Sequence, residues 1–268
     1  MEFSRAALVI AHPGHELRVH GWVSQYLPRT YVITDGSGHS GVSRLGSTQT
    51  VLCDLGSEPG EVFGRFSDRE IYDAIREHDS ALFQGLVDSL AHSFILHDVR
   101  TVAGDAIEWF NPTHDICRML INAAVDVVRL SSGRQIANYE FCLTEWEQGC
   151  EENHDDRCWH LHLEHDRLDH KLEAACNYVE LKDEVEQALA NRGKDYFRLE
   201  CLKRVPVAAP IVVPLTKPYY KICGEKRVID GTYHSVIRYE QHIAPLQRAL
   251  CDYVEIAARH FSPRHAIA

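Results

Sequence analysis

Apolar runs alternate with amphipathic helical patterns along the first half of the chain. Residues 6–11 form a short apolar run typical of a buried strand, and a helical pattern follows over residues 16–27. Further strands are predicted at 30–34, 62–63, 101–103 and 135–143. Further helices are predicted over 44–55, 68–78, 80–97 and 113–130, with Gly56 as a C-cap and Asp68 as an N-cap. This alternation predicts an α/β fold with a doubly wound, mostly parallel sheet.

The pattern changes after residue 145. Residues 149–170 are polar and rich in His, Asp and Glu, and four prolines punctuate residues 206–218. Helices are expected over 167–179, 181–191, 195–203 and 245–260, and a hairpin over 226–239 around Asp230-Gly231. We therefore divide the chain into an α/β core, residues 1–145, and a helical and irregular extension, residues 146–268. The extension either packs on the core or continues it as one domain.

Composition narrows the classes of partner. The formal net charge of -11 disfavours nucleic acid, because phosphate binding needs clustered Lys and Arg. No apolar run reaches the roughly 20 residues of a membrane span, and residues 1–5 do not read as a secretory leader. The nine cysteines include no CxxC pair, which favours reduced thiols. We therefore expect a cytoplasmic protein with a small-molecule substrate and no nucleic-acid or membrane partner, and a homo-oligomer is left open.

Three histidines fall in two loops of the predicted core. The apolar run 7–11 ends in a polar turn that contains His12 and His15, and His114 stands at the start of a later predicted helix. Ligands of α/β proteins usually bind at the carboxyl ends of the strands, where both loops are expected to lie. Three protein ligands with an open fourth position are typical of catalytic zinc. The sequence therefore predicts a Zn2+ site at these histidines, with Fe2+ or another divalent transition metal as the alternative.

Residues 1 to about 125 resemble the LmbE/PIG-L family of zinc-dependent N-deacetylases. The family pattern A-H-P-D-D-E stands here as Ala11-His12-Pro13-Gly14-His15-Glu16. The family's T-x-G turn corresponds to Thr34-Asp35-Gly36, and its helix-opening arginine corresponds to Arg44. Its H-x-D-H segment corresponds to Asn111-Pro112-Thr113-His114. The resemblance implies a Rossmann-like core. It also implies that His12, His15 and His114 are the metal ligands, with His15 in place of the family's second aspartate.

The family's chemistry is altered at two positions. Gly14 stands where the family has its general base, and glycine has no group that accepts a proton. Asn111 stands where the family has a histidine thought to polarise the substrate carbonyl. A three-histidine zinc can bring the pKa of bound water to about 7, so hydroxide could form with less help from a base. Asn111 could still donate an N–H to a developing oxyanion, and Asp35 or Asp115 could act as the base.

Other polar residues fit binding or structural roles. Arg44 could meet anionic or hydroxyl groups of a substrate, and the loop around Ser37 could hold an anion through its backbone N–H groups. Glu16 suits the first turn of a helix, where acidic residues are favoured, and is expected to support the loop. A second group of histidines consists of His160, His162 and His165. The chain contains 17 histidines, so chance explains this grouping better than a second metal site does.

These features predict a metal-dependent amide hydrolase. It would remove the acyl group of an N-acylated amino sugar or small glycoconjugate through metal-bound hydroxide. Two alternatives stay open. The chain could be a catalytically altered relative that only binds a sugar or metabolite, because Gly14 lacks the usual base. It could also be a three-histidine metalloenzyme with redox or lyase chemistry, because such ligands suit Fe2+ and Cu as well.

Overall fold

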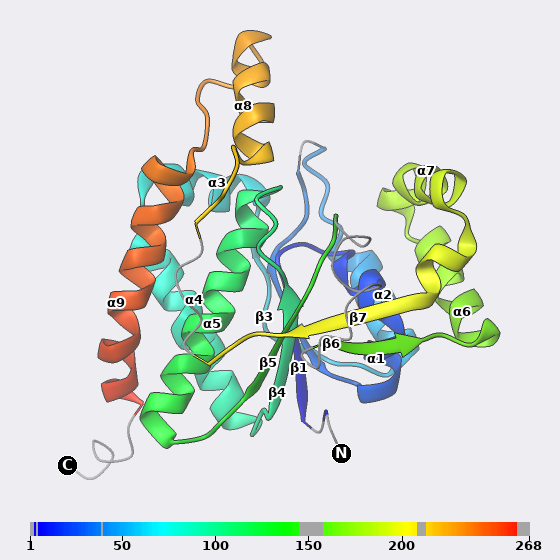
Figure 1. The fold of residues 1–268 in the computed structure, drawn as a ribbon, viewed down its shortest axis with the longest axis horizontal. Coiled ribbons are helices and arrows are strands. Elements are labelled where there is room, and N and C mark those ends of the chain that lie inside the picture. Colours follow the sequence, from blue (N-terminus) through cyan, green and yellow to red (C-terminus); the bar gives the residue numbers. More distant parts are fainter. Residues whose placement is uncertain (1–2, 4, 39, 145–157, 208–212, 262–268) are drawn as a thin grey trace.

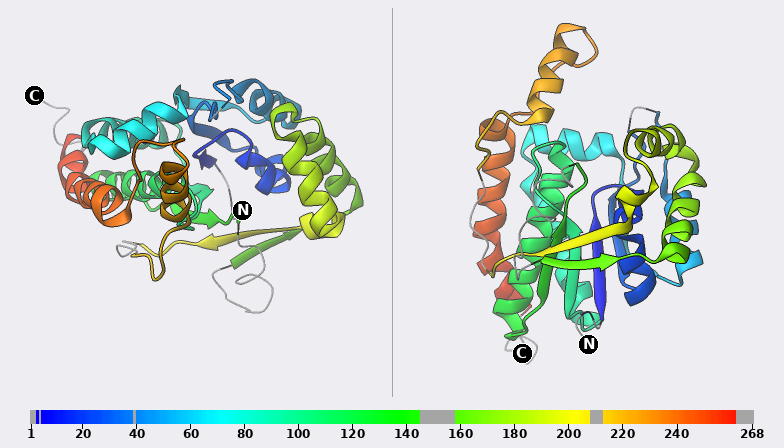
Figure 2. Two further views of the ribbon diagram at one scale, coloured as in Figure 1. Left: turned by 90° about the horizontal axis from the view of Figure 1, so that it is seen from above. Right: turned by 45° about the vertical axis from the view of Figure 1, so that its right-hand side comes forward.

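A seven-stranded sheet organises the residues that the structure describes, with helices on both of its faces (Figures 1 and 2). The computed structural model describes residues 3, 5–38, 40–144, 158–207 and 213–261. The strand order across the sheet is β3-β2-β1-β4-β5-β7-β6. The strands are β1 (Ala6–Ile10), β2 (Arg29–Thr34), β3 (Pro59–Phe66), β4 (Thr101–Asp105), β5 (Ala137–Phe141), β6 (Cys158–His162) and β7 (Leu199–Arg204).

The centre of the sheet is parallel. β3, β2, β1, β4 and β5 all run in one direction, whereas β7 is antiparallel to β5 and β6 is antiparallel to β7. Every residue of β1 and of β4 is buried, as expected of strands covered on both faces. The predicted α/β fold with a Rossmann-like, mostly parallel sheet is therefore confirmed. The strand order reverses between β1 and β4, which is where ligands usually bind in such folds.

Two groups of helices enclose the sheet. One group packs on a core that includes Phe83 and Leu120 and consists of α3 (Asp68–Glu77), α4 (Ser80–Leu96), α5 (Pro112–Ser132) and α9 (Ala244–His260). The other face carries Trp22 and Leu52, on α1 (His20–Tyr26) and α2 (Leu45–Leu55). The remaining helices are α6 (His165–Cys176), α7 (Lys182–Arg192) and α8 (Tyr219–Ile229). Short turns of helix complete the described chain: η1 (His15–Val19), η2 (Val179–Leu181), η3 (Lys194–Arg198) and η4 (Tyr239–Ile243).

Capping residues define the ends of the helices near the histidines. Gly56 ends α2 in the left-handed conformation, with φ 74°, as predicted. Asn111 caps α5, and its side chain accepts a hydrogen bond from the backbone N–H of Thr113. The prediction that Asp68 caps α3 is wrong. Ser67 is the cap, because it forms a reciprocal capping box with Glu70.

The helix predicted over 195–203 is also wrong. The turn η3 leads directly into strand β7, which pairs with both β5 and β6. The apolar residues of this segment fit a helical and an extended period equally well, so pairing with two neighbouring strands decides its structure. The extension therefore contributes strands to the sheet of the core in addition to helices.

The hairpin predicted over 226–239 is not formed, because α8 occupies the first part of this segment. Asp230-Gly231 instead ends the helix. Gly231 N–H donates to the carbonyl of Val228, and Thr232 N–H donates to the carbonyl of Arg227, which is a Schellman motif. Gly231 has a φ of 78°, and both a hairpin turn and a helix end use a glycine in this conformation.

Among the described residues, six cysteines are free thiols, as expected of a reduced protein: Cys53, Cys117, Cys142, Cys176, Cys223 and Cys251. Cys201 is disulfide-bonded, so the prediction of reduced thiols does not hold at that position. Among the described helices, none is long and apolar enough to cross a membrane.

A buried ion pair ties the extension to the core. Glu200 on β7 is fully buried, and its carboxylate accepts hydrogen bonds from the backbone N–H groups of Gly21 and Trp22 at the start of α1, each at 2.8 Å. Lys171 on α6 donates to the same carboxylate at 2.8 Å. One carboxylate therefore joins β7, α6 and α1.

Replacing Lys171 by Met is expected to lower the free energy of unfolding by about 3–5 kcal/mol, because it leaves the Glu200 carboxylate buried without its cation. Urea unfolding measures this change. The matched control is Lys182→Met, since Lys182 is 64% exposed and lies 3.9 Å from Glu186. This surface pair should contribute little. Equal effects of the two substitutions would contradict the account.

Candidate metal centre

The two predicted loops bring three imidazoles together at the carboxyl ends of β1 and β4. β1 ends at Ile10, and the turn that follows contains His12 and Gly14, the latter in a left-handed conformation with φ 104°. His15 begins η1, and His114 lies in the first turn of α5. The ring centroids of His12 and His15 are 5.3 Å apart, those of His12 and His114 are 5.0 Å apart, and those of His15 and His114 are 4.6 Å apart. The residues predicted as metal ligands therefore form one cluster.

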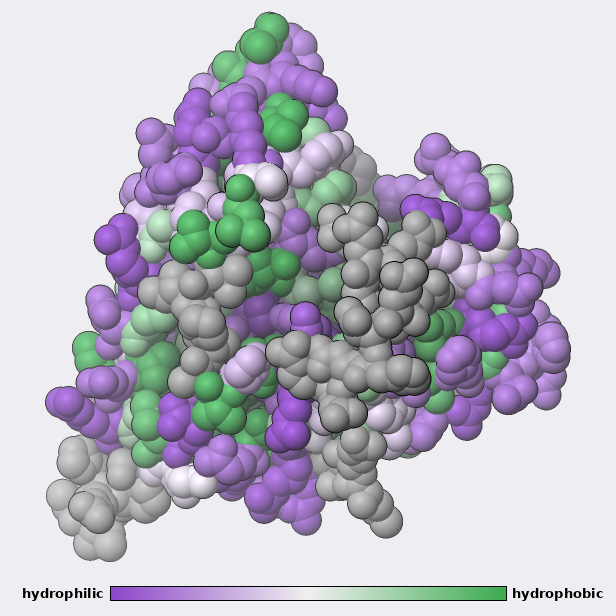
Figure 3. Space-filling model, viewed as in Figure 1, coloured by the Kyte–Doolittle hydropathy of each residue, from purple (hydrophilic) through white to green (hydrophobic). Residues whose placement is uncertain are grey.

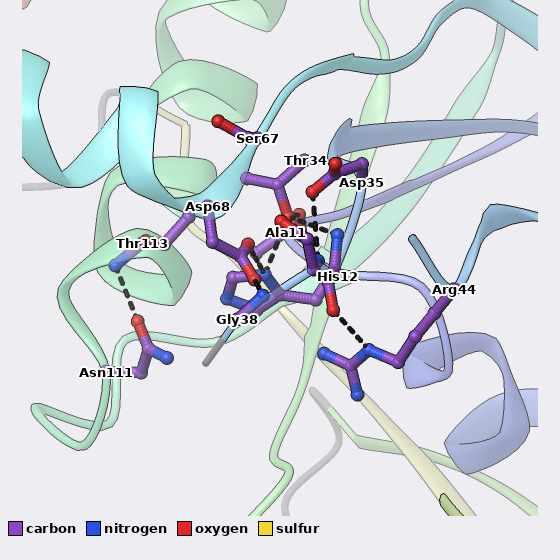
Figure 4. Close-up of polar contacts among 12 residues, drawn as sticks. Ala11, His12, Thr34, Asp35, Gly38, Arg44, Ser67, Asp68, Asn111 and Thr113 are labelled. Carbon is purple, nitrogen blue, oxygen red and sulfur yellow. Dashed lines mark hydrogen bonds and ion pairs between the residues drawn. The ribbon is translucent and has the colours of Figure 1, made fainter. Parts of the chain in front are cut away.

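His12 is held by groups on two neighbouring elements (Figure 4). Its Nδ1 lies 2.7 Å from the hydroxyl of Thr34 at the end of β2 and 2.8 Å from Oδ1 of Asp68 at the start of α3. Asp68 also accepts a hydrogen bond from Gly38 N–H at 2.6 Å. Burial alone would raise the pKa of the Asp68 carboxyl, but the contact with His12 and the other hydrogen bonds hold it well below its usual range. A charged Asp68 favours the tautomer of His12 with the proton on Nδ1.

His15 is oriented by a buried carboxylate. Its Nδ1 lies 3.1 and 3.0 Å from the two carboxylate oxygens of Asp105, the last residue of β4. Asp105 is fully buried and also accepts a hydrogen bond from Ala11 N–H at 2.8 Å. An aspartate behind a histidine is the usual way in which proteins orient a ring that binds a metal through its other nitrogen.

His12 and His114 are buried, and burial favours the neutral forms of these two imidazoles. Burial lowers the pKa of His12, and burial together with the neighbouring His15 and His12 lowers the pKa of His114 well below its usual value. Only neutral imidazole binds a metal. The electrostatics of the cluster are therefore those that a cation would need.

The donor atoms suit a transition metal. Nε2 of His12 and Nδ1 of His114 are buried without a hydrogen-bond partner among the described residues, and such atoms normally have one. Imidazole nitrogens suit zinc, iron and copper. Within the ranges that the structure describes, however, no three or more His, Cys, Asp or Glu side chains already converge as a metal-binding group. Binding would require the rings to turn toward a common point.

Two of the other predicted site residues border the cluster. Asn111 uses its side-chain oxygen to accept hydrogen bonds from Thr113 N–H and from the hydroxyl of Tyr72, so its amide N–H2 is the group left to donate. Arg44 donates from Nε to the carbonyl of Gly36, and its charge is among the groups that lower the pKa of His114. Arg44 therefore lies close enough to His114 to influence its charge, and Asn111 lies three residues before His114 at the start of α5. Figure 4 shows Asn111 with its contact to Thr113, and Arg44 with its contact to Gly36.

The two aspartates predicted as bases are engaged in shaping loops. Asp35 accepts a hydrogen bond from Ser37 N–H, which folds the glycine-rich loop and buries Ser37. Asp115 accepts hydrogen bonds from the backbone N–H groups of Glu108 and Trp109 in the loop before α5. Burial raises the pKa of Asp115 to about 8. Neither carboxylate contacts an imidazole of the cluster in any contact recorded for the described residues.

Gly14 is covered by the extension. A Cβ atom at this position would lie 2.5 Å from Cδ1 of Leu181 on η2 and 3.7 Å from the ring of Tyr178. The hydroxyl of Tyr178 contacts that of Thr48, which donates to Glu16. Glu16 in turn accepts a hydrogen bond from Gly14 N–H, so it supports the loop as expected. The space beside the turn at Gly14 is therefore filled by an apolar side chain from another part of the molecule.

Sequence reasoning missed Asp105 and the role of Asp68. A signal for Asp105 was present, because it directly follows the strand predicted at 101–103, and a carboxylate at the end of a central strand lies where ligands bind. No local signal indicates that Leu181 would pack on Gly14. The second histidine cluster does not form a site of the same kind, since His160, His162 and His165 are exposed.

Comparisons with known proteins support the fold. No protein-family model matches the chain, and no curated protein gives a significant match. Among solved structures, the fold is similar to the crystal structure of the conserved protein TT1542 from Thermus thermophilus. The TM-score is 0.51 at 15% sequence identity, over 80% of this chain and 99% of that one. At this identity the similarity shows the fold alone.

Adding a side chain at Gly14 is expected to destabilise the protein by contact with Leu181. Gly14→Ala should cost about 1–3 kcal/mol in urea unfolding, from overpacking and from the left-handed backbone. In Gly14→Ala/Leu181→Ala the overlapping methyl group is absent, so part of this cost should be recovered.

The control is Gly133→Ala, because Gly133 is also left-handed, with φ 71°, but has no atom within 4 Å of an added Cβ. Its cost should not depend on Leu181. A double-mutant cycle at Gly14 without coupling would contradict the proposed packing.

Proposed function

We propose that the chain is a metal-dependent amide hydrolase of the LmbE/PIG-L type, acting on an N-acylated amino sugar or small glycoconjugate. The observation that carries the proposal is the cluster of His12, His15 and His114 at the switch point of the sheet. Two of its ring nitrogens are buried without a partner among the described residues, and carboxylates lie behind two of its rings. Zn2+ held there would supply Lewis-acid chemistry, polarising an acyl carbonyl and acidifying water.

Charge balance supports a bound cation. Asp68 and Asp105 place two carboxylates against the imidazoles of His12 and His15, and burial lowers the pKa of His12. Buried carboxylates are stable when positive charge or hydrogen bonds compensate them. A divalent cation among the three rings would provide that positive charge.

Each of the proposed site residues then has a defined role. Asp68 and Asp105 hold the Nδ1 protons of His12 and His15, which leaves Nε2 of each ring to bind the metal. Asn111 would donate from its remaining N–H groups to the developing oxyanion. Arg44 binds hydroxyl or anionic groups of the substrate. The hydrogen bonds of Asp35 and Asp115 favour loop-shaping roles for both over the role of a base.

The compartment is part of the proposal. The free thiols of the described residues, among them Cys117 and Cys142, support a reducing environment such as the cytoplasm. The disulfide bond of Cys201, by contrast, favours an oxidising environment.

Metal content tests the proposal directly. Protein purified without added metal is expected to contain about one zinc ion per chain by elemental analysis, and His114→Ala should lose it. Asp105→Asn should weaken zinc affinity by about 10- to 100-fold, because His15 loses the carboxylate that orients it.

His92→Ala is the matched control, since His92 is exposed on α4, and it should retain the metal. Full metal content and activity in His114→Ala would overturn the proposal. Iron or copper in place of zinc would favour the redox or lyase alternative.

Asn111→Asp separates the two uses of this side chain. Aspartate keeps the oxygen that caps α5 but has no N–H to donate, so thermal unfolding should change little. The rate of acyl release from a responsive N-acetyl sugar should fall by about 10^2–10^3-fold, as when an oxyanion donor is removed. An unchanged rate would show that Asn111 acts only as a cap.

A second candidate function is the binding of a sugar or metabolite without catalysis. The packing of Leu181 on Gly14 favours it, because the position of the usual base has no room for a side chain. This candidate predicts ligand binding that persists after chelation, with no product formed.

A further inference from the structure

A projection beside the histidine cluster exposes apolar and basic side chains together. α8 extends away from the body of the molecule, and none of the other described elements flanks its end (Figures 1 and 2). We define the projection as residues 213–233, which include α8 and the segments before and after it. Its surface mixes hydrophobic and hydrophilic residues up to the tip (Figure 3).

Large apolar side chains on the projection are turned to solvent. Ile229 at the tip is 86% exposed, and Leu215 near the base is fully exposed. Four more are at least one-third exposed: Val213, Tyr219, Val228 and Tyr233. Single exposed apolar residues are normal on protein surfaces, but six on one short projection indicate a binding surface.

The charge of the projection is opposite to that of the whole chain. It contains four cations, Lys217, Lys221, Lys226 and Arg227, and two anions, so its net charge is +2 in a chain whose net charge is -11. Both anions are engaged within the projection. Glu225 pairs with Lys217, and Asp230 accepts hydrogen bonds from Thr232. Cations and aliphatic residues next to one another are typical of elements that lie in the interface of a membrane.

The base of the projection is attached to the site. Tyr219 N–H donates to the carbonyl of Trp109 at 2.8 Å, and the Tyr219 ring stacks on Phe110 with centroids 4.6 Å apart. Trp109 and Phe110 belong to the loop that ends in Asn111, directly before His114 and its helix. The base of the projection is therefore attached to the loop that leads into α5 and His114.

We propose that residues 213–233 dock on the surface of an anionic lipid bilayer, with the tip around Val228 and Ile229 inserted and the cations against the lipid headgroups. The projection is narrow and convex (Figures 1 and 2), a shape that suits insertion among the headgroups of a bilayer. A symmetric dimer through this surface would bring two basic projections together. This inference does not rest on the proposed enzymatic function.

The inference departs from the expectation of no membrane partner. That expectation rested on the absence of a run long enough to span a bilayer, and an element that lies on the surface needs no such run.

Co-sedimentation of the full chain with vesicles tests the inference. Vesicles of phosphatidylcholine with about 30% phosphatidylserine should bind the protein at about 0.1 M salt, and vesicles of phosphatidylcholine alone should bind it weakly. Val228→Ser/Ile229→Ser and Lys226→Glu/Arg227→Glu should each lower the affinity by at least about fivefold.

Leu96→Ser/Val179→Ser is the matched control, because it removes two exposed apolar side chains away from the projection, and it should bind like the unaltered chain. Circular dichroism checks that each variant is folded. Absence of binding to the anionic vesicles, or equal binding by the tip and control variants, would overturn the inference. A loss of dimer mass in light scattering for the tip variant alone would instead identify the surface as a contact between copies of the chain, and would also overturn it.

Discussion

The arrangement of the site depends on the carboxylate of Asp105. It accepts a hydrogen bond from Ala11 N–H, which fixes the chain where it leaves β1, and it contacts Nδ1 of His15, which fixes a ring four residues later. Its own backbone carbonyl accepts a hydrogen bond from Arg118 on α5, the helix that begins beside His114. A single buried residue at the end of β4 thus connects both histidine loops at the edge where the sheet reverses its strand order.

The extension completes the site from the other side. The Lys171–Glu200 pair holds α6 and β7 against the start of α1. This position brings Tyr178 and Leu181 over the turn at Gly14. The surroundings of the histidines therefore combine a polar inner side, built by the core, with an apolar outer side built by residues more than 160 positions later in the chain. The apolar cover lies where a side chain at position 14 would otherwise project.

Local sequence patterns predicted the parallel core and the three clustered histidines. The run 6–11 is short and apolar throughout, which fits a strand buried on both faces. The histidines could be predicted because each directly follows a strand or opens a helix. Asp105 could have been included by the same reasoning. Local patterns did not predict features that depend on long-range packing. The apolar residues of β7 also fit a helix, and the neighbour of Gly14, Leu181, is distant in sequence. The prediction of a hairpin at Asp230-Gly231 was wrong because a glycine in the same conformation occurs in hairpin turns and at helix ends.

Anomalous X-ray diffraction from crystals grown with zinc tests the central claim most directly. The account predicts a zinc peak within about 2.0–2.1 Å of a ring nitrogen of each of His12, His15 and His114, with Asp105 still behind His15. A zinc peak on other side chains, or three imidazoles that remain free of metal at saturating zinc, would contradict it.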